Sequence, residues 1–300
     1  MFPASPVARG AFASAALILA VTVVVAVEPQ PDPASSSVLE LRWGGDAEGG
    51  APFVEADPSD PTRLEGFDVE IAGEIARGLG RTARFVQVAW ESIDASTARG
   101  DFDIGMSGVE DTPGRRARLL TTVPYFEFRE VLTVRAGDRD RLTSLADLKA
   151  RRVGTLGSTM AYDLLLDARA RHGIVPVSYD DDVHPYTDLL GGRLDGVLLD
   201  HVIAQRATRR VDGLFTHPAA VATGRYVGVL APGNEVLRDR VDEILLQRMR
   251  DGTLERIFRR WEVWDETQRA FVARTLAEAE TAAGCVKRPS TRRVARCAIT

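Results

Sequence analysis

Cysteine and lysine are almost absent from this chain of 300 residues, which contains two residues of each kind. Both cysteines, Cys285 and Cys297, lie near the C-terminus. The residues before them therefore provide no disulfide, no four-cysteine zinc site and no thiol nucleophile. A bridge between the two cysteines would close only the tail, so we expect it to have little effect on the core.

Several motifs that mark catalytic or cofactor sites are also missing. The sequence has no GxGxxG or GxxxxGK[ST] loop for nucleotide phosphates, no HExxH zinc motif and no GxSxG nucleophile motif. The histidines lack the spacing of a metal-ligand set: they are His172, His184, His201 and His217. We therefore expect no cofactor and no metal ion.

Long apolar runs are missing except at the N-terminus. Residues 10–27 are uncharged, follow Arg9 and end before Glu28. We interpret residues 1–27 as a secretory signal peptide and the Pro- and Ser-rich residues 28–37 as a linker. The alternative is an uncleaved anchor, because the run nearly reaches the roughly 18–20 residues that span a bilayer. Either interpretation places the body outside the cytoplasm, and this segment is the membrane contact that we expect within the chain.

Positive charge is not in excess, since 38 Lys and Arg residues face 43 Asp and Glu residues for a net charge of −5. This balance argues against a general nucleic-acid-binding protein, which would be basic. Apolar residues make up 45% of the chain and charged residues 27%, as in ordinary globular proteins. The length suits two compact lobes of roughly 100–150 residues each.

After the linker, short apolar runs alternate with helical patterns, which predicts an α/β fold with largely parallel sheets. Asp68 stands where it could cap the first helix, which ends at Gly80. A last helix near 271–283 precedes a basic end, and we expect residues 265–300 to be helical at first and then flexible. Strands are expected at 38–43, 84–88, 102–106, 131–135, 153–156, 174–177, 196–199 and 227–230, and further helices at 93–98, 160–169, 187–191, 202–209, 236–250 and 254–261.

The body also resembles the polar amino acid-binding family of bacterial solute-binding proteins, the receptors that supply ABC importers. The resemblance covers about residues 38–264 and depends on six segments in the family's order rather than on any one of them. These segments are LRWGGD (41–46) followed by APF (51–53), GFDVEIA (66–72), GDFDI (100–104), TPGR (112–115), PYF (124–126) and LDGVLLD (194–200).

The resemblance implies an α/β, two-lobed periplasmic-binding-protein-like (type II) fold with two hinge crossovers. Lobe one would comprise residues 38–133 and 228–264, and lobe two with the hinge would comprise 134–227. The crossovers would lie near 132–136 and 225–230, and the ligand would lie between the lobes at the carboxyl ends of the strands. The implied function is a periplasmic protein, expected to be monomeric, that captures a polar amino acid and delivers it to the permease of an ABC importer.

The resemblance also implies how a zwitterion would be held, since its two charges both need partners once water is excluded. Arg115 would bind the ligand carboxylate through its planar fork, with Arg116 as the alternative. The backbone amides of Ser158, Thr159 and Met160 would contribute at a helix N-terminus. An ordinary Ser/Thr helix cap is a second interpretation of that loop, and the two are compatible.

Three further positions carry family roles together with plainer alternatives. Asp200 would bind the ligand ammonium, or else cap the helix that starts near Val202. Asp46 would meet the ligand side chain or help to close the cleft. Trp90 would form an aromatic wall, although a tryptophan at such a position can equally belong to the core.

Two departures from the family pattern concern the ligand. Glu48, Gly49 and Gly50 fill the stretch where the family carries a stacking aromatic, so that aromatic is expected to be missing. Glu110 stands where the family has a serine or threonine, and its carboxylate would repel a ligand carboxylate unless it turns aside, is protonated or is paired. A salt bridge with neighbouring arginines is the alternative role for Glu110.

Ser107 and Gly108 remain candidate donors to the ligand, and the unusual Asp111 next to Glu110 leaves room for a more cationic or larger ligand. The second function to consider is a lyase on the same fold. Periplasmic cyclohexadienyl or arogenate dehydratases resemble this family, and Glu110 could serve such an enzyme as a general acid. The primary expectation is nevertheless a binding protein and not an enzyme, since Arg115 and Asp200 already suit simple binding.

Overall fold

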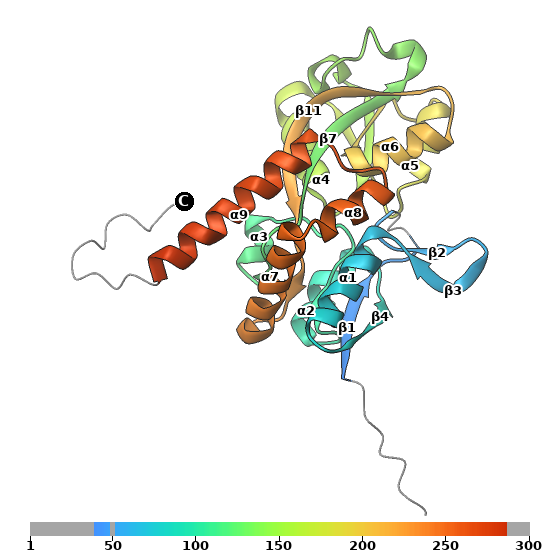
Figure 1. Cartoon of the computed structure of the whole chain (residues 1–300). Helices are drawn as coiled ribbons and strands as arrows, with labels where there is room; N and C mark the ends of the chain where they lie inside the picture. The colour runs from blue at the N-terminus through green and yellow to red at the C-terminus, as the bar shows by residue number, and fades with distance from the viewer. Residues whose placement is uncertain (1–38, 49–51, 287–300) are drawn as a thin grey trace, which may run out of the picture. The chain divides into compact units, whose positions relative to one another are not determined.

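The structure is a computed structural model that describes residues 39–48 and 52–286 (Figure 1). The expected signal peptide, the linker, the basic end and Cys297 lie outside the described residues. Within the described part of the chain, no helix combines the length and the apolar character that crossing a lipid bilayer requires.

The elements follow the alternation expected from the sequence, with several additions. These are the short hairpin β2–β3, the short helix α3, the short strand β6 and the long strand β11. In chain order, the main elements are β1 (Glu40–Gly45), β2 (Glu55–Asp57), β3 (Asp60–Glu65), α1 (Phe67–Gly78), β4 (Thr82–Gln87), α2 (Ile93–Arg99), β5 (Ile104–Gly105), α3 (Pro113–Arg116), β6 (Leu120–Thr121), β7 (Phe126–Arg135), β8 (Arg152–Leu156), α4 (Met160–His172), β9 (Val175–Tyr179), α5 (His184–Leu190), β10 (Gly196–Asp200), α6 (His201–Arg210), β11 (Leu214–Tyr226), β12 (Val229–Leu230), α7 (Glu235–Arg250), α8 (Thr253–Arg260) and α9 (Glu266–Val286).

The strands of the described residues form two five-stranded sheets besides the hairpin (Figure 1). Lobe one is built on the sheet ordered β4-β1-β5-β12-β6, and lobe two on the sheet ordered β11-β7-β10-β8-β9. Helix α1 packs on the first sheet through Phe67, Ile71 and Ile75, which recur every four residues and are fully buried. Helix α4 packs on the second sheet through its buried Ala161, Leu165 and Ala168, so an apolar helix face covers part of each sheet, as an α/β fold requires.

The expectation of largely parallel sheets is wrong. Among the described strands of the two sheets, four neighbouring pairs are parallel (β1–β4, β1–β5, β8–β9 and β8–β10) and four are antiparallel (β5–β12, β6–β12, β7–β10 and β7–β11). The β7–β11 pair is antiparallel because β7 enters lobe two and β11 leaves it, so the two strands run side by side in opposite directions.

The chain passes between the sheets twice. It leaves the first sheet at β6 and enters the second at β7, so the first passage lies at 122–125, and it returns through residues 227–228. The second passage lies within the expected 225–230, whereas the expected first crossover at 132–136 lies inside β7. Charged Glu127, Arg129 and Glu130 hid the start of that strand in the sequence. The lobe limits stay a prediction, with the first passage moved to 122–125.

Asp68 does not cap α1, contrary to expectation. The helix begins at Phe67 after Gly66, and Asp68 is buried in its first turn, where its Oδ2 accepts a hydrogen bond of 2.8 Å from the Gly108 amide. Gly66 has a φ of 144°, and a Cβ there would lie 2.1 Å from the Phe53 carbonyl oxygen, so only glycine suits this start. Burial raises the pKa of Asp68 to about 7.

The helix expected near 271–283 is confirmed and is longer, running from Glu266 to Val286 as α9. Near its start, the Gln268 side chain donates to the Glu127 carbonyl and accepts from the Glu127 amide. Arg274 pairs with the Glu127 carboxylate at 2.8 Å, and Phe271 is buried. The helix is therefore fastened to the first residues of β7.

Candidate functional site

The site lies where the carboxyl ends of strands from both sheets meet. A cavity of about 30 Å³, the first cavity, is lined by residues from both lobes. A second cavity of about 530 Å³ lies next to it, and Trp90, Glu110 and Thr159 line both. Lobe one contributes Phe53, Trp90, Ser107, Gly108 and Glu110 to the first cavity, and lobe two contributes Glu130, Leu156, Thr159, Ala161, Leu199, Asp200 and Ile203.

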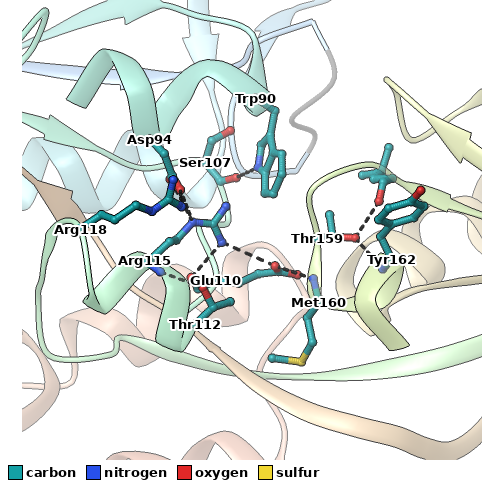
Figure 2. A network of polar contacts seen from close by, with 11 residues as sticks. Trp90, Asp94, Ser107, Glu110, Thr112, Arg115, Arg118, Thr159, Met160 and Tyr162 are labelled. Carbon is teal, nitrogen blue, oxygen red and sulfur yellow. Dashed lines mark hydrogen bonds and ion pairs between the residues drawn. The ribbon is translucent and has the colours of Figure 1, made fainter. Parts of the chain in front are cut away.

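Arg115 projects from α3 into the region between the two lobes (Figure 2). The hydroxyl of Thr112 accepts a hydrogen bond of 3.2 Å from the Arg115 amide and so caps this short helix. The Arg115 Nε donates to Asp94 at 3.0 Å, and Nη1 donates to the Glu110 carbonyl at 3.0 Å. The guanidinium lies 5.3 Å from the centre of the Trp90 ring, close enough for a cation–π contact, and Arg115 is 7% exposed.

Arg116, the alternative to Arg115, points away from the two cavities. Its side chain is 57% exposed and pairs with Asp111. The unusual Asp111, whose side chain is 8% exposed, is therefore paired with Arg116. Of the two adjacent arginines, Arg115 lines the second cavity and Arg116 lines neither.

Glu110 extends from lobe one to lobe two. Its Oε2 accepts a hydrogen bond of 2.8 Å from the Met160 amide, and the same oxygen lies 3.6 Å from Arg115 Nη1 (Figure 2). The backbone of Glu110 forms an antiparallel bridge with Tyr226, which fixes its position beside β11. Glu110 is 5% exposed, and burial outweighs the attraction of Arg115 and raises the pKa of its carboxyl to about 7.

The loop before α4 lies at the same place and begins the helix there. The Thr159 hydroxyl accepts from the Tyr162 amide at 3.1 Å and donates to the Leu156 carbonyl at 2.7 Å, so Thr159 is the helix cap. The residue before it, Ser158, has a φ of 59° and lines the second cavity. The Met160 amide, the next donor along, is taken by Glu110.

Asp200 and Glu130 form the lobe-two floor of the first cavity. They face each other across the antiparallel pair β10–β7. The Asp200 carboxylate caps α6 by accepting from the Ile203 amide at 2.9 Å, so the capping role holds while Asp200 also lines the cavity. Burial raises the pKa of Asp200 to about 6.

Glu130 was missed by the sequence analysis. It is 1% exposed, and its Oε2 has no hydrogen-bond partner among the described residues. Burial, reinforced by the charges of Glu110 and Asp200, raises its pKa well above the ordinary value. The signal was the alternation along β7, which places Glu130 on the same strand face as Phe126, Phe128 and Leu132.

Asp46 and Ser107 both form hydrogen bonds with Trp90, and Ser107 also lines the first cavity. Asp46 accepts from the Trp90 amide at 2.9 Å and from the Gln87 side chain at 3.0 Å, and it lines a separate cavity of about 260 Å³. The Ser107 hydroxyl accepts from the Asp46 amide at 3.3 Å, and its carbonyl accepts from the Trp90 indole at 3.1 Å. These contacts hold the indole in place.

Phe53 lines the first cavity from beyond residues 48–50, the stretch from which the family's stacking aromatic is expected to be missing. Phe53, a few residues after the glycines, is buried and packs edge-on against Tyr226 at 5.3 Å. A Cβ at Gly108 would lie 2.6 Å from the Phe53 ring, so a glycine there leaves room for the aromatic. The APF segment (51–53) was the feature of the sequence that could have pointed to Phe53 as a lining residue.

The balance of charge around the cavities is acidic. Glu110, Glu130, Asp200 and Asp94 carry carboxyl groups, and Arg115 contacts two of them. Among the described residues, no group of three or more His, Cys, Asp or Glu side chains is placed to hold a metal ion. The arrangement can therefore accept hydrogen bonds from, and neutralise, a positively charged small molecule.

Comparison with known proteins gives consistent matches. The family model described as bacterial extracellular solute-binding proteins, family 3, matches residues 41–263. The L-cystine-binding protein TcyJ of Escherichia coli strain K12 is 28% identical over 203 residues, which are 67% of this chain and 76% of that protein. The ABC transporter arginine-binding protein 1 of the same strain is 28% identical over 208 residues, 66% of this chain and 82% of that protein.

A solved structure also matches, that of the ancestral amino acid-binding protein AncCDT-1, described as a precursor of cyclohexadienyl dehydratase. Its TM-score is 0.68 at 24% identity, covering 74% of this chain and 95% of that one. At that identity the likeness shows the fold alone. The two-lobed α/β fold expected from the sequence is confirmed.

Proposed function

Because this chain belongs to the bacterial extracellular solute-binding proteins, family 3, we propose that it captures a polar amino acid between its lobes and delivers it to an ABC importer. The observation that carries this proposal is the cavity lined from both sides, with Trp90 on lobe one and Asp200 on lobe two. Closure of two lobes around a small ligand is the usual action of such a fold.

In this proposal, the amino group of the ligand binds to lobe two. An ammonium has three donors and needs acceptors once it is buried. Asp200 and Glu130 supply carboxylate oxygens at the cavity floor, and Phe53 and Trp90 supply its apolar walls. The named relatives bind cystine and arginine, which supports an amino acid-like ligand for this chain.

Export and delivery belong to the same proposal. The apolar run at 10–27, read as a signal peptide, would carry the protein out of the cytoplasm. The permease of the importer would then be its partner, with the protein itself a monomer. The binding proteins of similar sequence include one named as periplasmic, which agrees with this location.

A thermal-shift panel over the common amino acids tests the proposal. A ligand present at a hundredfold excess over its Kd stabilises the folded protein by about 2.7 kcal/mol and raises Tm. Asp200→Asn keeps a helix-capping side chain but removes the carboxylate, so its shift should fall while its own Tm stays near that of the wild type. The absence of a shift with every amino acid would refute the proposal.

A second candidate function has one observation in its favour. Glu110 is a buried carboxyl group in the cleft with a pKa raised to about 7, which suits a general acid at neutral pH. The candidate is the dehydratase-like lyase. Incubation with prephenate or arogenate and measurement of product absorbance tests it, and an unchanged spectrum at high protein concentration rules it out.

A further inference from the structure

We propose that Glu110 supplies the carboxylate that this cleft would otherwise take from its ligand, so that the cleft selects organic cations and gains nothing from a ligand carboxylate. The preferred ligand is then an amine with a second positive charge on an apolar stem. This inference rests on the proposed function, because it concerns the same cleft and refines the class of its ligand.

The first support is the position of the Glu110 carboxylate. The groups expected to hold a ligand carboxylate are the Arg115 guanidinium and the amides at the start of α4. Glu110 Oε2 accepts from the Met160 amide at 2.8 Å and lies 3.6 Å from Arg115 Nη1. One side chain of the protein thus meets both groups at once, buried between the lobes.

The second support is that carboxylates of the protein already neutralise the positive charge of Arg115. Its Nε donates to both oxygens of Asp94, at 3.0 and 3.2 Å, and its Nη1 donates to the Glu110 carbonyl. Arg118 also lies 3.3 Å from Asp94, so a ligand carboxylate entering here would be the third carboxylate beside two guanidiniums. Repulsion between like charges at such distances is strong where water is excluded.

The third support is the unpartnered acid on the opposite side of the first cavity. Glu130 is 1% exposed, lines the cavity, and has an Oε2 without a hydrogen-bond partner among the described residues. Asp200 faces it on the neighbouring strand. Two adjacent buried carboxyl groups with a free acceptor are suited to an ammonium donor.

The space available supports a ligand with a stem and two charged ends. The first cavity, at about 30 Å³, holds little more than one buried water, so only an ammonium head suits it without further opening. The second cavity, at about 530 Å³, shares Trp90 and Glu110 with the first and is also lined by the acids Glu91, Asp94 and Asp163 and by Arg115 and Arg118. An apolar stem could lie along the indole and place a second cation among these acids.

Matched ligand pairs test the inference, because each pair differs only in the α-carboxylate. Calorimetry on the intact protein compares lysine with cadaverine, ornithine with putrescine and arginine with agmatine. In the wild type, each amine should bind at least tenfold more tightly than its parent amino acid. In Glu110→Ser, which removes the internal carboxylate, the parent amino acids should become the tighter ligands.

Two further variants keep the test decisive. Glu110→Gln keeps the size and an oxygen acceptor for the Met160 amide but lacks the charge, so the preference for amines should shrink in it even if Glu110→Ser folds poorly. Glu243→Ser makes the same substitution on the exposed face of α7, where the side chain is 74% exposed, and should leave every affinity unchanged.

The outcomes separate this inference from the proposed function. Parent amino acids that bind more tightly than their amines to the wild type would overturn the inference and leave the proposed function standing. Tight amine binding that is unchanged in Glu110→Ser and Glu110→Gln would overturn the role of Glu110. If no amino acid binds, whether or not the amines do, the proposed function itself fails.

Discussion

The two sides of the cleft differ in how fully their polar groups are satisfied. On lobe one, Arg115 is held by Asp94 and Glu110, and Asp46 holds the backbone of Trp90. On lobe two, Glu130 is buried with an oxygen that lacks a partner among the described residues. On lobe one, these polar groups that face the cleft already have partners within the protein. On lobe two, a buried carboxyl oxygen has none among the described residues, and a hydrogen-bond donor of the ligand can supply it.

The largest expected effect tests whether these lobe-one groups depend on the Arg115 cation. Arg115→Ala leaves the buried Glu110 without its positive partner and leaves Asp94 with the exposed Arg118 alone, which should lower the free energy of unfolding by about 3–5 kcal/mol. Urea unfolding measures this change. Arg116→Ala, which removes the exposed neighbour paired with Asp111, is the matched control and should cost less than about 1 kcal/mol. Equal losses in the two variants would contradict the comparison.

The next effect concerns pH, and its sign follows from the buried acids of both lobes. Burial raises the pKa of Asp68 to about 7 and that of Asp200 to about 6, above the ordinary 3.8. These two carboxyl groups therefore bind protons more tightly in the folded protein than in the unfolded chain, and the stability that they contribute falls as pH rises from about 4 to 7. For Asp68 alone the fall is on the order of 4 kcal/mol at most.

Urea unfolding of the ligand-free protein at pH 5 and pH 7.5 measures this fall. Asp68→Asn removes the titrating group of lobe one and should make the difference between the two pH values smaller. A difference that is as large in Asp68→Asn as in the wild type would assign the effect to lobe two, to Glu130 and Asp200. A stability that rises across this window would contradict the expected sign.

The smallest effect separates two roles of one lobe-two residue. Asp200→Ala removes the cap of α6 together with the cavity carboxylate, whereas Asp200→Asn retains a capping oxygen. The alanine variant should be less stable than the asparagine variant by about 1 kcal/mol, as for other helix caps. Thermal unfolding without ligand measures the difference. Equal stabilities would mean that the hydrogen bond to Ile203 contributes little.

The helices and strands were largely predictable where the apolar spacing within one segment is enough to identify it. The helix at 202–209 and the strand at 196–199 appear as α6 and β10, because their apolar spacing is local. The antiparallel pairing of β7 with β11 was not predictable in this way. It joins residues about 80–100 positions apart, and charged residues such as Glu127 interrupt the apolar run of β7.

The sequence indicated which residues lie at the candidate site. It did not indicate which groups those residues contact. Trp90 and Thr159 line both cavities, Arg115 lines the second and Asp200 the first, while the family roles of these residues stay predictions. The direction of Glu110 could not be read from the sequence, because it depends on a bridge to Tyr226, far along the chain. Its partner at Met160 belongs to the other lobe and is set only by how the two lobes meet.

The C-terminal helix has a mechanical consequence. Helix α9 contacts α7, which packs on lobe one, and through Gln268 it is hydrogen-bonded to β7 of lobe two. Helix α9 therefore connects the two lobes next to the passages of the chain between them. Parting of the lobes must either slide α9 along α7 or break its bonds to Glu127, a resistance that a chain ending at Val263, where the family match ends, would not meet.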